Sequence, residues 1–173
     1  MLGDFHVDMS GRFYRKQTVG IACVGVQSKT HVGCILQKHL IRSVEKRLYS
    51  DDPKLDRAKL YSICIYLLIR RNLDKINTLV ICNDENFDLV KACLHTILVA
   101  EKQPRFAIIS ISDLKKRVGF DIESLADNYA KHYRKRALNR NKWNIGVKLN
   151  IIEVKYKDIE TYWEILEYQK YKM

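Results

Sequence analysis

Residues 79–90, LVICNDENFDLV, are the stretch that decides the fold. Residues 79–82 are apolar and suit a buried strand, and an amphipathic helix pattern begins within four residues of them. Asp84 stands at the junction. Because ligands and metals bind at the carboxyl ends of strands in open α/β sheets, Asp84 is our first candidate site residue. An Asp in this place also serves as a helix N-cap or turn residue, and that alternative stays open.

The composition suits one globular domain. The chain has 173 residues, of which 47% are hydrophobic, so it is long enough to bury a core. No apolar run approaches the roughly 18 residues of a membrane span. The first residues also lack the basic and then apolar pattern of a secretion signal. We therefore expect a cytoplasmic protein that does not contact a membrane.

The cysteines argue against a disulfide framework and a structural zinc. All lie in apolar runs, with no CxxC pair and no closely spaced Cys and His set; they are Cys23, Cys34, Cys64, Cys82 and Cys93. Buried free thiols of this kind are typical of a reducing compartment. A metal in this protein would be bound by oxygen.

The charge predicts a polyanionic partner. Lys and Arg number 31 against 20 Asp and Glu, which gives a formal net charge of +11. Such an excess at this size favours a nucleic acid. Charge alone supplies attraction to phosphates and says nothing about chemistry.

Upstream of residues 79–90, the pattern predicts three strands joined by short turns, at residues 4–9, 18–27 and about 31–44. Short connections indicate an antiparallel meander. Helix and strand patterns then alternate over residues 55–71, 76–82, 86–101, 106–111 and 123–138. This alternation predicts a parallel extension of the sheet. The expected fold is α/β, a mixed five-stranded sheet with helices on both faces in the order βββαβαβα.

The last residues predict a strand at 148–156 and a helix at 158–171. We expect a main domain over residues 1–140 and an extension over 141–173 that packs on it. The extension could cover an edge strand or form a homodimer contact.

Four short motifs in this order resemble those of the ribonuclease H family. Asp8-Met9-Ser10 resembles the Asp-Gly-Ser that ends the family's first strand, with Met9 in place of the glycine. The stretch from Asn83 to Phe87 resembles the Thr-Asp-Ser-x-Tyr that follows its fourth strand.

The other two motifs lie on predicted helices. Ala126-Asp127-Asn128-Tyr129-Ala130 resembles the Ala-Asp-x-Leu-Ala that opens the family's final helix. The run DRAKL at residues 56–60 resembles the Asn-Arg-x-Glu-Leu that opens its first helix. The similarity covers residues 4–138 and leaves the tail without a counterpart.

The resemblance implies a metal-dependent nuclease. In the family, acids at the positions of Asp8, Asp84 and Asp127 hold two divalent metals, Mg²⁺ or Mn²⁺, that activate a water and stabilise the leaving oxygen. The implied reaction is hydrolysis of a phosphodiester in an RNA–DNA hybrid or a related RNA or DNA structure. Junction-resolving and transposon-type nucleases share the fold, so the substrate stays open.

Lys59 departs from the family pattern, because it stands where the resemblance expects a metal-binding glutamate. An ammonium cannot coordinate Mg²⁺, although it can stabilise phosphate oxygens. Asp56 or Glu45 could supply the missing acid. The family's histidine loop also has no counterpart, since residues 112–119 contain no His. The alternative function is therefore a catalytically degenerate nucleic-acid-binding or scaffold module of the same fold.

Basic and aromatic residues near these acids are candidates for nucleic-acid contact. They are Arg12, Tyr14, Arg15, Lys16, Arg57, Lys131, Arg134, Lys135, Arg136 and Arg140. A third possibility, a doubly wound nucleotide-binding protein, requires a Gly-rich loop between a strand and a helix, and the sequence has none.

Overall fold

One mixed sheet forms the centre of the structure, a computed structural model that describes residues 2–119, 123–138 and 149–170, the side chains of 169 and 170 excepted. The strand order is β5-β4-β1-β2-β3-β6. Strands β1 (Gly3–Ser10), β2 (Val19–Gly25) and β3 (His31–Leu36) form an antiparallel meander. Strand β4 (Ile76–Ile81) pairs in parallel with β1, and β5 (Ala107–Ser110) pairs in parallel with β4. The predicted α/β class and mixed sheet are confirmed.

Within the described part of the chain the sheet has six strands, not the predicted five. The sixth is β6 (Ile151–Ile152), which pairs in parallel with β3. It is much shorter than the strand predicted at residues 148–156, of which residue 148 lies outside the described part of the chain. The extension thus adds a strand to the sheet that the rest of the chain builds.

The predicted third strand at residues 31–44 is wrong beyond residue 36. After β3 the chain turns into helix α1 (Lys38–Leu48). Ile41 and Val44 of α1 are buried, while Arg42 between them is exposed. Ile41, Val44 and Leu48 are three and four residues apart, which is a helical period, but residues 31–44 alone contain too little of it to exclude a strand.

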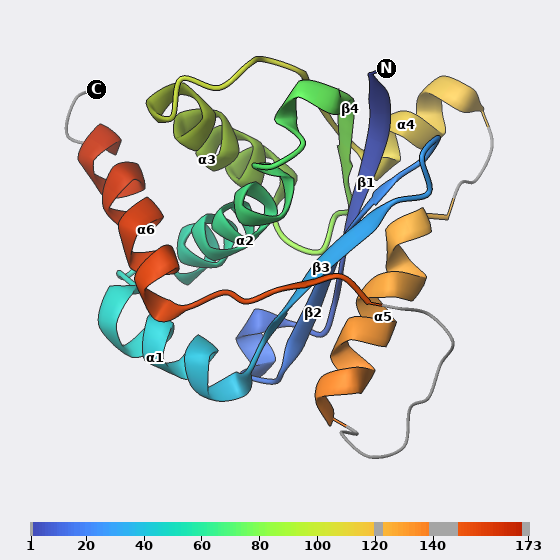
Figure 1. The fold of residues 1–173 in the computed structure, drawn as a ribbon. Helices are drawn as coiled ribbons and strands as arrows, with labels where there is room; N and C mark the ends of the chain where they lie inside the picture. Colours follow the sequence, from blue (N-terminus) through green and yellow to red (C-terminus); the bar gives the residue numbers. More distant parts are fainter. Residues whose placement is uncertain (1, 120–122, 139–148, 171–173) are drawn as a thin grey trace.

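The helices lie on both faces of the sheet (Figure 1). On one face are α1, α2 (Pro53–Ile69), α3 (Phe87–Ala100) and α6 (Tyr156–Lys170). On the other face are α4 (Ile111–Val118) and α5 (Leu125–Leu138). Two short 3-10 helices, η1 (Phe13–Arg15) and η2 (Leu73–Lys75), lie in the connections. Helices α1 and α4 are absent from the predicted order.

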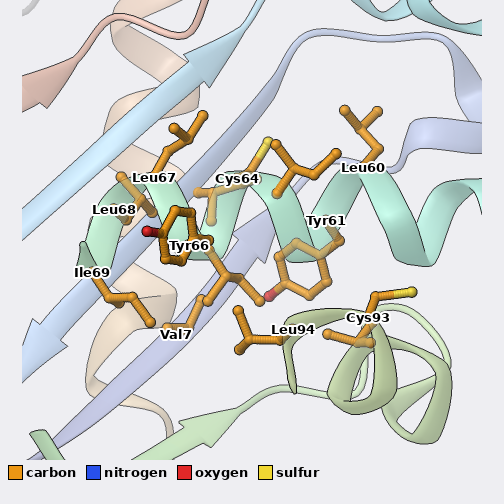
Figure 2. Packing of buried hydrophobic residues seen from close by; sticks show 14 of the residues in the cluster. Val7, Leu60, Tyr61, Cys64, Tyr66, Leu67, Leu68, Ile69, Cys93 and Leu94 are labelled. Atoms are coloured by element: carbon orange, nitrogen blue, oxygen red, sulfur yellow. The ribbon is translucent and has the colours of Figure 1, made fainter. Parts of the chain in front are cut away.

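Helix α2 is the centre of the larger core. Tyr61, Leu67 and Leu68 of α2 are at most 1% exposed. They pack with Val7 of β1 and Leu94 of α3 (Figure 2). The helix is buried on nearly every side because α3 and α6 cover the surface that does not face the sheet. Each such side chain contributes about 1.5–3 kcal/mol by leaving water.

Small residues set the distance between α5 and the sheet. A Cβ on Gly20 would lie 2.5 Å from the carbonyl oxygen of Ala130 and 2.6 Å from the amide nitrogen of Arg134. A Cβ on Gly33 would run into the ring of Tyr133. Gly20 therefore lets the backbone of α5 lie directly against β2, and Gly33 leaves room for the ring of Tyr133 against β3.

The extension packs on the same chain. Helix α6 contacts α1, α2 and α3 and buries Ile159, Trp163 and Leu166 among them. These contacts use the apolar face of the helix within one molecule, and the homodimer stays a prediction. The five cysteines are free and buried. In the residues described, no helix combines the length and apolar character needed to cross a membrane.

Candidate active site

The structure brings Asp8, Asp84 and Asp127 to one pocket of about 350 Å³. Asp8 lies in β1, Asp84 lies in the loop after β4, and Asp127 lies in the first turn of α5. The amide of Cys82 donates to the carbonyl oxygen of Val7 at 3.1 Å and so continues the pairing of β4 with β1. That bond holds the loop beside Asp8. Three elements that are distant in sequence thus meet at the carboxyl ends of β1 and β4.

Asp8 is 7% exposed and strongly bonded. Its Oδ1 accepts from the Met9 amide at 2.7 Å, and its Oδ2 accepts from the Cys82 thiol at 3.1 Å. Burial, together with a hydrogen bond to Asp84 and the charge of Asp84, raises the pKa of Asp8 to about 7. Two carboxyl groups this close in a buried site resist ionising together. Below that pH the carboxyl of Asp8 therefore carries a proton.

Asp84 has one oxygen paired with a cation and one that is not. Nη1 of Arg12 contacts its Oδ1 at 2.5 Å. Its Oδ2 is buried, and among the described residues no amide, hydroxyl or cationic group donates to it, so the neighbouring carboxyl of Asp8 is the hydrogen-bond partner left to Asp84. Asp84 is also not the cap of α3, because the Oδ1 of Asn86 accepts from the Leu89 amide at 3.0 Å in that role. An unpaired buried carboxylate oxygen is costly, which suggests that Asp84 is placed for a ligand.

Asp127 forms an ion pair on its own helix. Its Oδ2 contacts the Nζ of Lys131 at 2.5 Å, and both side chains are at least 40% exposed. Arg134, one turn further on, donates to the Thr18 carbonyl oxygen at 3.0 Å and to the Gln17 side chain at 2.7 Å. Four cations therefore line the pocket beside the acids: Arg12, Arg15, Lys131 and Arg134.

The acids fit a hard cation in part. Carboxylate oxygens are the ligands that Mg²⁺ and Mn²⁺ take, and the unpaired oxygen of Asp84 lies beside Asp8. Over residues 2–119, 123–138 and 149–170, however, no three His, Cys, Asp or Glu side chains lie close enough together to hold one ion. The pair Asp8 and Asp84 could hold an ion once Asp8 has lost its proton and Arg12 has left Asp84. Asp127 would join it after separating from Lys131.

Lys59 does not line this pocket. Its ammonium is buried at the junction of α2 and α6, where it contacts Glu167, lies 3.3 Å from Asp56 and sits 5.1 Å from the centre of the Trp163 ring. Burial lowers the pKa of Lys59, but Glu167 and Asp56 outweigh burial and raise it overall. The role that this geometry gives Lys59 is to hold α6 on α2.

The two acids considered as replacements also lie elsewhere. Asp56 is fully buried and accepts from the amide and hydroxyl of Ser50 at 2.6 and 2.9 Å. Glu45 of α1 pairs with Lys16 at 3.2 Å. Neither residue lines the pocket of the aspartates.

Sequence reasoning missed Tyr61 and Glu85. Tyr61 is fully buried, and its hydroxyl has no hydrogen-bond partner in the described part of the chain. The pKa of Tyr61 is raised well above the ordinary value by burial and by the nearby charge of Asp84. One carboxylate oxygen of Glu85 is contacted by Arg57 at 3.2 Å, and the other is buried with no hydrogen-bond partner among the residues that the structure describes. Burial raises the pKa of Glu85, and Arg57 partly offsets it. The position of Glu85 directly after Asp84 was the available signal; Tyr61 reads as one more apolar residue of α2.

Four other candidates for nucleic-acid contact do not line the pocket; they are Tyr14, Arg57, Lys135 and Arg136. Tyr14 is exposed, and the guanidinium groups of Arg15 and Arg57 lie 5.6 and 5.9 Å from its ring centre. Lys135 and Arg136 of α5 are exposed. Arg140 lies outside the described residues.

Comparison of the chain with protein-family models, with curated proteins and with solved structures found no match. The site is therefore interpreted from its own geometry.

Proposed function

We propose that this chain is a divalent-metal-dependent nuclease of the ribonuclease H type. The observation that carries the proposal is the pocket in which aspartates from β1, from the loop after β4 and from α5 meet within a ring of cations. The antiparallel meander extended by parallel strands β4 and β5 supports it, since the resemblance in sequence implies such a sheet. The net charge of +11 supports a nucleic-acid substrate.

Asp8 and Asp84 would hold Mg²⁺ or Mn²⁺ in this mechanism. A bound divalent ion lowers the pKa of its water and stabilises the leaving oxygen of the phosphodiester. Asp8 must lose its proton to bind an ion, and its pKa of about 7 places that step near neutral pH. Arg12 must leave Asp84, and the phosphate of the substrate is a suitable new partner for its guanidinium.

A second ion depends on Asp127. Lys59 of α2 is paired with Glu167 of α6, and no acid of α2 lines the pocket, so the remaining carboxylate is that of Asp127. Its contact with Lys131 is exposed to solvent and is therefore weak. A phosphate of the substrate could pair with Lys131 in place of Asp127, and the carboxylate of Asp127 would then be free to bind a metal ion. Two-metal catalysis thus requires the substrate to be present.

The alternative is a nucleic-acid-binding or scaffold module without chemistry. The two ion pairs favour it, because Arg12 and Lys131 neutralise Asp84 and Asp127 as the pocket stands. In both cases the binding surface is the same. The five buried thiols suit a reducing compartment, and we place the protein in the cytoplasm.

A cleavage assay separates the two functions. The protein and an Asp84→Asn variant are incubated with an end-labelled RNA–DNA hybrid, single-stranded RNA and duplex DNA, each with Mg²⁺ or Mn²⁺. We expect the parent chain to cleave at least one substrate and the variant to lose cleavage while its thermal unfolding stays cooperative. Tight binding without cleavage in either protein would establish the binding module and refute the nuclease.

A further inference from the structure

Helix α1 carries a row of exposed cations that the sequence analysis did not assign. Lys38, Arg42 and Lys46 follow one another at i, i+4 and i+8, so they lie along one face. All three are exposed, and none forms an ion pair within the described residues. The opposite face of α1, with Ile41 and Val44, is buried in the core.

The other charged residues of α1 have partners. Glu45 is its only acid, and it is paired with Lys16. The guanidinium of Arg47 lies 5.3 Å from the centre of the Tyr156 ring. The row of Lys38, Arg42 and Lys46 is thus left as an uncompensated positive stripe.

The stripe is connected to the candidate active site through η1. The Lys16–Glu45 ion pair joins α1 to the residue that follows η1, and Figure 1 shows α1 beside η1 at the lower edge of the sheet. Arg12, which precedes η1, contacts Asp84 in the pocket. The ion pair of Lys16 with Glu45 therefore holds α1 next to the segment that carries Arg12 and Arg15 into the pocket.

We propose that α1 binds the backbone of the nucleic acid whose phosphodiester lies in the pocket, through Lys38, Arg42 and Lys46. The inference rests on the proposed function only in taking nucleic acid as the substrate class. Eight residues of helix span about 12 Å, which is about three to four nucleotides at 3.4 Å of rise each. A regular row of cations matches a partner with regularly repeated charges.

A membrane surface fits α1 less well. A helix that lies in a membrane inserts an apolar face beneath its basic face. The apolar face of α1 is occupied by the core, with Ile41 1% and Val44 0% exposed. The surface offered to a partner is therefore charged alone, which favours nucleic acid over lipid.

The test compares two triple variants of equal charge. One carries Lys38→Gln, Arg42→Gln and Lys46→Gln on α1. The control carries Lys75→Gln, Lys102→Gln and Arg105→Gln, three exposed residues that precede the amino ends of β4 and β5, away from the pocket. Each variant lowers the formal net charge from +11 by three, 11 − 3 = +8.

Binding of a labelled RNA–DNA hybrid without metal is measured by fluorescence anisotropy from 50 to 400 mM salt. Each lost phosphate contact lowers the slope of log K against log salt by about 0.9 on B-form duplex, so the α1 variant is expected to lose about 2 to 3 units of slope. The control is expected to change it by less than about 1, since it removes no direct contact. Equal changes of slope in the two variants would overturn the proposal. A slope for the α1 triple variant equal to that of the parent chain would overturn it as well.

A single Arg42→Gln variant guards against misfolding of the triple variant and should lose about 0.9 units of slope. If the parent chain cleaves and the α1 triple variant keeps the parent's salt slope, this inference is overturned and the proposed nuclease function stands. A reduced slope in a protein that does not cleave would support α1 as a binding surface and refute the nuclease. A parent chain that binds no nucleic acid would refute both.

Discussion

Replacing Asp8 by Asn should stabilise the protein at alkaline pH and leave its stability almost unchanged at acid pH. Burial and Asp84 raise the pKa of Asp8 to about 7 in the folded chain, against an ordinary value of 3.8. Between these two values the unfolded chain has released the proton and the folded chain has kept it. The contribution of Asp8 to the free energy of unfolding therefore falls as pH rises from about 4 to about 7. Above pH 7 this contribution no longer changes with pH.

The size of the effect follows from the two pKa values. A difference of about three units, at 1.36 kcal/mol for each unit, corresponds to about 4 kcal/mol. Asn is neutral at both extremes and nearly the same size as Asp. Its side-chain oxygen can still accept from the Met9 amide, and its NH₂ group can donate to Asp84. The variant should thus match the parent chain near pH 4 and exceed its stability by up to about 4 kcal/mol at pH 8.

Urea unfolding followed by circular dichroism at pH 4, 6 and 8 measures this difference. The same substitution at the exposed Asp51 serves as the control and should give one stability difference at all three pH values. If Asp8→Asn also gave a difference that did not change with pH, the coupling of Asp8 with Asp84 would be refuted. A variant less stable than the parent chain at pH 8 would refute it as well.

Three further predictions follow from other contacts. Lys59→Met should lower the free energy of unfolding in urea by about 3–5 kcal/mol, because it leaves Asp56 buried without its cation. Lys157→Met, the control at a side chain that is 80% exposed, should change that free energy by less than about 0.5 kcal/mol. Arg12→Gln should raise the Mn²⁺ affinity of the free protein severalfold by releasing Asp84, and Arg15→Gln should not; equal affinities in isothermal titration would contradict this. Gly20→Ala should lower both the melting temperature and the cleavage rate, because the new Cβ pushes α5 and Asp127 away from the sheet; an unchanged melting temperature would show that α5 is not held by that contact.

Most of the sheet could be predicted because its strands carry strong local signals. Val19 to Gly25 is apolar on both faces, and the structure buries all seven residues in β2. Helix α1 was missed because its period is helical only when Ile41, Val44 and Leu48 are read together, and the run directly follows a true strand. Strand β6 is short because only Ile151 and Ile152 pair with β3, and the extent of that pairing is not encoded in the local sequence.

The acids of the site could be predicted, and their surroundings could not. Asp8 and Asp84 end neighbouring strands, so the parallel pairing of β1 and β4 brings them together. The position of Lys59 depends on Glu167, which is 108 residues away and lies in the extension. The pairing of Arg12 with Asp84 likewise joins residues 72 apart, through a loop whose path only the folded chain determines.

The most direct test of the account is Mn²⁺ binding to the pocket at pH 8, measured from the electron paramagnetic resonance of the free ion. The parent chain should bind at least one Mn²⁺, and Asp8→Asn and Asp84→Asn should each weaken that binding by tenfold or more, while the exposed Asp51→Asn should leave it unchanged. A parent chain that takes up no Mn²⁺, or an Asp84→Asn variant that takes up as much as the parent chain, would contradict the claim that these aspartates form a metal site.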